Sequence, residues 1–73
     1  MEFSSEMEEV CKRQATNPSN THVVFYPTGD DLEWDWVVAR SFTEAQDLRR
    51  ELTAPGYDST DGIIVNLLKY WEG

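Results

Sequence analysis

The sequence has a single cysteine, a single histidine and no long apolar run. Because Cys11 has no second thiol to pair with, the chain cannot form an internal disulfide and is not a disulfide-stapled secreted scaffold. No apolar run approaches the roughly 20 residues that a membrane-spanning helix needs. The acidic N-terminal stretch lacks the basic start and apolar middle of a signal peptide. We therefore expect a cytoplasmic protein that does not enter a membrane.

The sequence motifs of common catalytic, cofactor and metal sites are missing as well. Cys11 and His22 lie eleven positions apart, and neither a G-x-S-x-G elbow nor an orienting third residue accompanies them. No zinc-ligand spacing, glycine-rich phosphate loop or dinucleotide fingerprint is present. We therefore expect no enzymatic activity, no cofactor and no bound metal.

Basic residues are scarce, since 14 acidic residues face only 6 basic ones and give a net charge of −8. Such a surface repels the phosphate groups of nucleic acids and of anionic membranes, so direct binding to either is disfavoured. A basic protein surface would be attracted. Solubility alone also explains an acidic surface, so the charge leaves both interpretations open.

Four of the carboxylates crowd into residues 30–35. An EF-hand loop that began at Asp31 would need a glycine where Trp36 stands and a glutamate where Phe42 stands. We therefore interpret the carboxylates as solvated groups on an exposed strand face. They are Asp30, Asp31, Glu33 and Asp35.

The first half of the chain predicts a helix and then a strand. Ser5-x-x-Glu8 has the form of a capping box, and Ser4 is a second good N-cap residue. A thin apolar stripe with Met7 and Cys11 follows, and Asn17-Pro18 ends the segment, so we expect a helix at about 5–15. The β-rich run HVVFY predicts a strand at about 22–26.

The centre of the chain switches from strand periodicity to helix periodicity. Trp34, Trp36 and Val38 alternate with polar residues, which predicts a strand at about 32–40. Ser41-x-x-Glu44 then has the form of a capping box and predicts a helix at about 42–53.

The last segment, GIIVNLLKYWEG, fits either a strand or a helix. The β-branched triplet that begins at Ile63 favours a strand, which we place at about 63–70, whereas Leu67-Leu68-Lys69 favours a helix. The expected fold is a small α+β domain covering residues 1–73, with an N-terminal helix followed by β-β-α-β. Three strands form the sheet, one helix packs on it, and the second and third strands are parallel if they share it.

The layout also resembles a group of known proteins. From Val37, VVARSFTEAQDLRRELTAPGYDSTDGIIVNL reads as a strand, a capped helix with Glu44-Ala45, a Pro55-Gly56 loop and a closing apolar strand. In layout, size and acidity, residues 21–73 resemble small phage-encoded inhibitors of host machinery, of the bacterial RNA polymerase inhibitor or anti-CRISPR type. The resemblance implies a stoichiometric inhibitor that covers a surface of a host enzyme in the bacterial cytoplasm, and it transfers no functional residue.

The charge, the aromatic content and the missing catalytic motifs together favour a protein-binding module that inhibits or regulates a larger, basic-surfaced protein. Trp36 and Phe25 are the expected core aromatics. If the Trp34 side of its strand packs on the second helix, the opposite side is open and strongly negative. The predicted contact residues are Tyr26, Asp30, Asp31, Glu33, Trp34 and Asp35.

Three alternatives stay open. The carboxylates could imitate phosphates and block a DNA- or RNA-binding enzyme such as a CRISPR effector or nuclease, which requires two rows at phosphate-like spacing. A small ligand-binding or enzymatic domain would have a concave pocket lined by His22 or by a carboxylate with a strongly shifted pKa. A homo-oligomer could bury the last strand, and the sequence leaves the oligomeric state open.

Overall fold

The structure is a computed structural model that describes residues 2–29 and 33–71. The expected α+β fold is confirmed: an N-terminal helix precedes a three-stranded sheet, on which a second helix packs. In chain order the elements are α1 (Ser5–Gln14), β1 (His22–Pro27), β2 (Trp34–Ala39), α2 (Phe42–Leu52), β3 (Ile63–Asn66) and the 3₁₀ helix η1 (Leu67–Tyr70).

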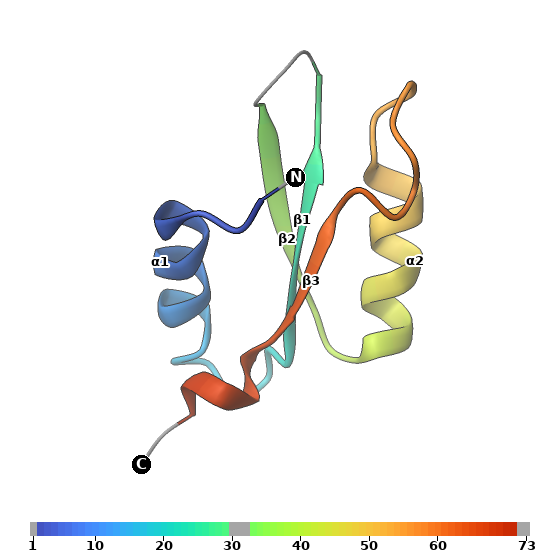
Figure 1. Cartoon of the computed structure of the whole chain (residues 1–73). Helices are drawn as coiled ribbons and strands as arrows, with labels where there is room; N and C mark the ends of the chain where they lie inside the picture. Colours follow the sequence, from blue (N-terminus) through green and yellow to red (C-terminus); the bar gives the residue numbers. More distant parts are fainter. Residues whose placement is uncertain (1, 30–32, 72–73) are drawn as a thin grey trace.

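The sheet has the order β2-β1-β3, and β1 is antiparallel to both neighbours (Figure 1). Phe25, near the middle of β1, lies opposite Trp36 of β2 and Ile63 of β3. The strands joined through α2 therefore run in the same direction, as expected, but β1 lies between them. The inserted central strand leaves β2 and β3 as the two edges of the sheet.

The two helices cover opposite faces of the sheet (Figure 1). Alternate residues of β1 point to alternate faces, so Val23 and Phe25 face α1 whereas Val24 faces α2. The α1-side core consists of the buried residues Met7, Cys11, Val23, Phe25, Val65 and Leu67. The α2-side core consists of Val24, Ala39 and Ala45, with Tyr26, Val37, Leu48 and Ile64 packed against it.

The side of β2 that carries Trp34 and Trp36 packs on α1 and not on α2. The open, negative face was expected only if the Trp34 side packed on the second helix, and that condition is not met. Trp34 and Trp36 contact the α1-side core, and the Trp34 ring lies edge-on to Phe25 with 5.6 Å between centroids. The opposite side of β2 is covered by α2 at Val37 and Ala39. Because both faces of the sheet are covered, alternation along β2 does not identify the helix that each face meets.

The helix caps differ in detail from the expected capping boxes. The N-cap of α1 is Ser4, whose Oγ accepts the Met7 N–H, and Ser5 is already the first helical residue. At α2 the expected cap is present, since the Ser41 Oγ accepts the Glu44 N–H at 3.0 Å. The Glu44 carboxylate, however, accepts the backbone N–H of Arg40, one residue before the cap.

The third strand ends at Asn66 rather than near residue 70, so the predicted strand is too long. The Asn66 Oδ1 accepts the N–H of Leu68 at 2.9 Å and caps η1. Leu67 is fully buried in the α1-side core. The strand therefore ends where the β-branched run ends, and the leucines that favoured a helix form the 3₁₀ turn.

A glycine lets the chain enter β3 close to the central strand. A Cβ on Gly62 would lie 2.6 Å from the carbonyl oxygen of Phe25, which is closer than such atoms approach. Only a residue without a side chain allows this approach of β3 to β1.

Candidate protein-binding surface

The carboxylates of the described residues all lie on the surface. Among residues 2–29 and 33–71, the single ion pair joins Arg50 and Asp47 at 2.6 Å. The other described carboxylates therefore have no cation in direct contact, and their charge is available to a partner. The exposed acidic residues are Glu2, Glu6, Glu8, Glu9, Glu33, Asp35, Glu44, Asp47, Glu51, Asp58 and Asp61.

Two segments far apart in the sequence form one acidic end of the molecule. The Tyr57 hydroxyl donates to the Gly29 carbonyl at 2.5 Å, and the Ala54 N–H donates to the Pro27 carbonyl at 3.0 Å. These bonds join the loop after α2 to the end of β1, next to the β1–β2 connection, and the two segments lie at the same end of the sheet (Figure 1). We call the exposed carboxylates there the acidic end: Glu33, Asp35, Asp58 and Asp61.

Sequence reasoning missed the loop carboxylates of the acidic end. Asp58 and Asp61 stand in a polar loop with no periodicity, and nothing local relates them to Glu33 or Asp35. Asp58 accepts both the backbone N–H and the hydroxyl of Thr60, and these bonds hold the pKa of Asp58 below its usual value. Asp58 is therefore fully ionised at neutral pH.

The predicted contact residues have different surroundings. Glu33 and Asp35 are exposed, but the Asp35 carboxylate accepts the N–H of Trp36 at 2.7 Å. Tyr26 is half-buried on the α2 side, and burial and the nearby Asp35 carboxylate raise its pKa. Trp34 is half-buried against Phe25. Asp30 and Asp31 lie outside the described residues.

The aromatic residues with the most exposed rings are not the predicted anchors. The exposed aromatic residues are Phe3 at 42 %, Phe42 at 54 % and Trp71 at 38 %. Phe42 begins α2 and Trp71 follows η1, and both of these positions lie at the end of the sheet away from the acidic end (Figure 1). The acidic end therefore combines charge with partly exposed tyrosine, whereas Phe42 and Trp71 lie at the opposite end.

The thiol and the imidazole are held on opposite faces of the sheet. Cys11 is fully buried in the α1-side core, and burial raises its pKa to about 11, so the thiol stays protonated at neutral pH. His22 is buried near Phe42, with 5.9 Å between ring centroids, and its Nδ1 lies 2.8 Å from the Thr21 hydroxyl. The two groups do not meet, so they do not form a nucleophile–base pair.

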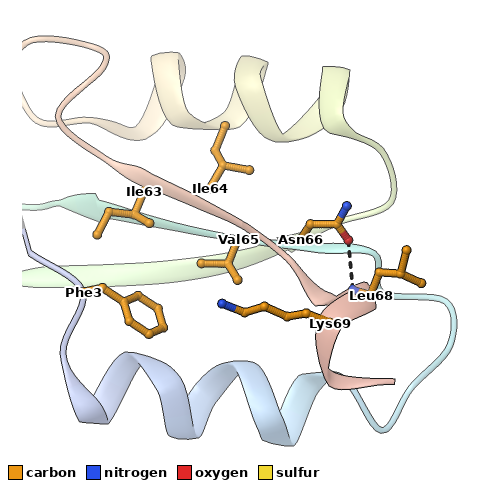
Figure 2. Close-up of a pocket in the computed structure, with 7 residues that line it drawn as sticks. All are labelled: Phe3, Ile63, Ile64, Val65, Asn66, Leu68 and Lys69. Carbon is orange, nitrogen blue, oxygen red and sulfur yellow. Dashed lines mark hydrogen bonds between the residues drawn. The ribbon is translucent and has the colours of Figure 1, made fainter. Parts of the chain in front are cut away.

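A groove runs along the outer edge of β3 and has a volume of about 590 Å³ (Figure 2). It has an apolar character with one cation, and it contains no carboxylate. Its lining residues are Phe3, Ile63, Ile64, Val65, Asn66, Leu68 and Lys69.

Within the described parts of the chain, no group of three or more His, Cys, Asp or Glu side chains is placed to hold a metal ion. The described helices also include none that is long and apolar enough to cross a membrane.

No protein-family model, curated protein or solved structure matches the chain.

Proposed function

We propose that the protein is a small acidic binding module that inhibits or regulates a larger protein by covering a basic site on it, one molecule per site. The observation that supports the proposal is the exposure of every described carboxylate, with a single ion pair among them. Charges that are neither buried nor paired attract an oppositely charged surface over about a Debye length, roughly 8 Å at physiological salt.

The acidic end is the proposed contact. Glu33 and Asp35 extend from the sheet, and Asp58 and Asp61 extend from the loop that Tyr57 ties to Gly29. These four groups concentrate negative charge at one end of the molecule. Such a concentration accelerates association with a basic surface and orients the encounter.

The proposed mode of action is occlusion, and the proposed partner is a large bacterial enzyme with a basic surface, such as RNA polymerase. In this mode the bound module blocks access by steric and electrostatic means and performs no chemistry on the partner. The buried, protonated Cys11 thiol and the separate His22 are consistent with this mode, because neither is available as a nucleophile or a base to an external substrate.

The proposal is tested by charge reversal at the acidic end with a control of equal charge. We expect Glu33→Lys/Asp35→Lys to slow association with bacterial RNA polymerase by at least about tenfold at low salt, as measured by stopped-flow or surface plasmon resonance. Glu8→Lys/Glu9→Lys changes the net charge equally on exposed positions of α1 and should slow association much less. Circular dichroism confirms that both variants fold.

The possible outcomes separate the parts of the proposal. Equal slowing by the two variants would show that net charge acts without the acidic end. An absence of binding by the unmodified protein would remove RNA polymerase as the partner. Competition between the module and duplex DNA for the polymerase would place the covered site in the DNA channel, the outcome that nucleic-acid mimicry requires.

A further inference from the structure

The loop between α2 and β3 starts with a tight turn over residues 54–57. The Tyr57 N–H donates to the Ala54 carbonyl at 3.2 Å, and Gly56 has a φ of 97°. Proline at the second position and glycine with a positive φ at the third are characteristic of a type II turn, and Pro55 and Gly56 occupy these positions. The turn brings its first and last residues close together, so both can reach the same neighbouring segment.

Both end residues of this turn bond to the chain that leaves β1. The Ala54 N–H donates to the Pro27 carbonyl at 3.0 Å. The Tyr57 hydroxyl donates to the Gly29 carbonyl at 2.5 Å. Within the described ranges, these are the two hydrogen bonds that join residues 54–61 to the rest of the chain, and only the second depends on a side chain.

The loop carboxylates belong to a second turn, which is closed by its own hydrogen bonds. The Asp61 N–H donates to the Asp58 carbonyl at 2.9 Å, and the Asp58 N–H donates to the Asp61 carboxylate at 3.1 Å. The Asp58 carboxylate also accepts the Thr60 N–H at 2.9 Å. Because this turn holds its own shape and begins directly after Tyr57, the group that fixes Tyr57 also fixes both carboxylates.

Gly29 lies beside the carboxylate of the other acidic segment. The Glu33 Oε1 atom is 2.9 Å from the position that a Cβ on Gly29 would take. The Thr28 N–H donates to the Glu33 carbonyl at 3.2 Å and holds this part of the chain together. Gly29 therefore meets both the Glu33 carboxylate and the Tyr57 hydroxyl, so the two segments of the acidic end join at this residue.

We propose that Tyr57 is the positioning residue of the acidic end: its bond to Gly29 holds the loop carboxylates beside Glu33, so that both segments bind one basic segment together. Placing the loop before a partner arrives removes the cost of ordering it on binding. The ligand that fits carries several cationic side chains, since carboxylates from two segments need more than one cation. The inference rests on the proposed function and adds the residue that makes the two segments act as one site.

Tyr70 provides a matched control for the test. Its hydroxyl oxygen is buried and has no hydrogen-bond partner among the described residues. Tyr57→Phe and Tyr70→Phe each remove one phenolic hydroxyl and leave every carboxylate in place. Only Tyr57→Phe removes a bond between distant segments, so a difference between the two variants reports on that bond.

Backbone order parameters from NMR relaxation test the positioning without a ligand. For the N–H groups of Asp58 and Asp61 we expect about 0.85 in the unmodified protein and in Tyr70→Phe, and a fall toward about 0.6 in Tyr57→Phe. Gly56→Ala is a second variant, because a Cβ there meets nothing within 4 Å and strains only the positive φ of the turn. It should lower the same order parameters. Unchanged values in Tyr57→Phe would overturn the proposal.

Octalysine at low salt is the probe for binding, followed by the amide chemical shifts of the four residues of the acidic end. In the unmodified protein and in Tyr70→Phe, we expect the four signals to shift with one common dissociation constant. In Tyr57→Phe this dissociation constant should be at least about threefold higher, although the charge of the protein is unchanged. Circular dichroism confirms that each variant is folded.

The outcomes separate the positioning role from the proposed function. Equal affinity of Tyr57→Phe and Tyr70→Phe for octalysine would overturn the positioning role and leave the acidic end as a contact. Four signals that do not shift in the unmodified protein would overturn the acidic end as a site for cations, and the positioning role with it.

Discussion

The two faces of the sheet are stabilised by different kinds of side chains. On the α1 side, Phe25 is fully buried and two half-buried tryptophans pack around the core, which also contains sulfur from Met7 and Cys11. On the α2 side, the fully buried residues are Val24, Ala39 and Ala45. Large aromatic side chains bury far more apolar surface than valine or alanine. The difference indicates that the free energy of folding is concentrated on the α1 side, although α1 itself buries only two residues.

The largest expected effect comes from truncating the central aromatic residue of the α1 side. Phe25→Ala should lower the free energy of unfolding by about 3–5 kcal/mol. The total free energy of unfolding of a domain of this size is about 3–5 kcal/mol, so the variant should be largely unfolded at 25 °C. Val24→Ala removes less buried volume from the α2 side and should cost about 2 kcal/mol. Urea denaturation measures both, and an equal cost for the two variants would contradict the asymmetry.

The α2 side should be sensitive to added volume. Ala45 is fully buried where α2 meets the sheet, so Ala45→Leu should destabilise the protein by about 1–3 kcal/mol through overpacking. The exposed neighbour Gln46 is the control, and Gln46→Leu should change the stability by less than about 0.5 kcal/mol. If Ala45→Leu is tolerated as well as Gln46→Leu, the α2 side is more loosely packed than the structure indicates.

Alkaline pH should destabilise the α1 side through its buried thiol. Burial raises the pKa of Cys11 from 9.0 to about 11, so the unfolded chain releases this proton at lower pH than the folded protein. The stability due to the protonated thiol is therefore complete below about pH 9 and falls as the pH rises toward 11. We expect a loss of about 2 kcal/mol between about pH 8 and 10.5.

Urea denaturation across this pH range measures the effect, with Cys11→Ala as the comparison. The variant has no thiol to titrate, so its stability should fall less steeply over the same range. A raised Tyr26 pKa acts in the same direction in both proteins and leaves the difference between them unchanged. Identical pH profiles would show that the Cys11 thiol does not contribute.

The smallest expected effects come from removing the side-chain caps of the two helices. The Ser41 Oγ bonds the Glu44 N–H at 3.0 Å and is supported by the bond from Arg40 to the Glu44 carboxylate. The Ser4 Oγ bonds the Met7 N–H at 3.3 Å. We expect Ser41→Ala to cost about 1 kcal/mol and Ser4→Ala to cost less. Chemical denaturation of both variants gives the order, and the reverse order would contradict the inference from the two cap geometries.

Local patterns in the sequence predicted which segments are helices and strands better than they predicted where those segments pack. The change of period after Val38, together with Ser41 and Glu44, correctly indicated a strand followed by a capped helix. The end of β3 was misplaced because the leucines after Asn66 fit either a strand or a helix by local propensity. Burial of Leu67 and the Asn66 cap, both features of the folded chain, decided in favour of the turn.

The candidate site was only partly predictable for the same reason. The sequence indicated that Glu33 and Asp35 are exposed, because carboxylates are rarely buried without a partner. It contained no local signal that Asp58 and Asp61 join them, because that depends on the bond from Tyr57 to Gly29 between segments 28 residues apart. The position of β3 at an edge of the sheet was equally hidden, because it depends on β1 being the central strand.

The sequence by itself determined the helix and strand types, the acidic surface and the lack of a second thiol, because these properties depend on neighbouring residues or on composition. Only the tertiary structure decided the strand order, the helix that covers each face and the sharing of one end by two acidic segments. These features depend on pairing between distant segments, and alternation along a single strand is the same whichever helix covers it.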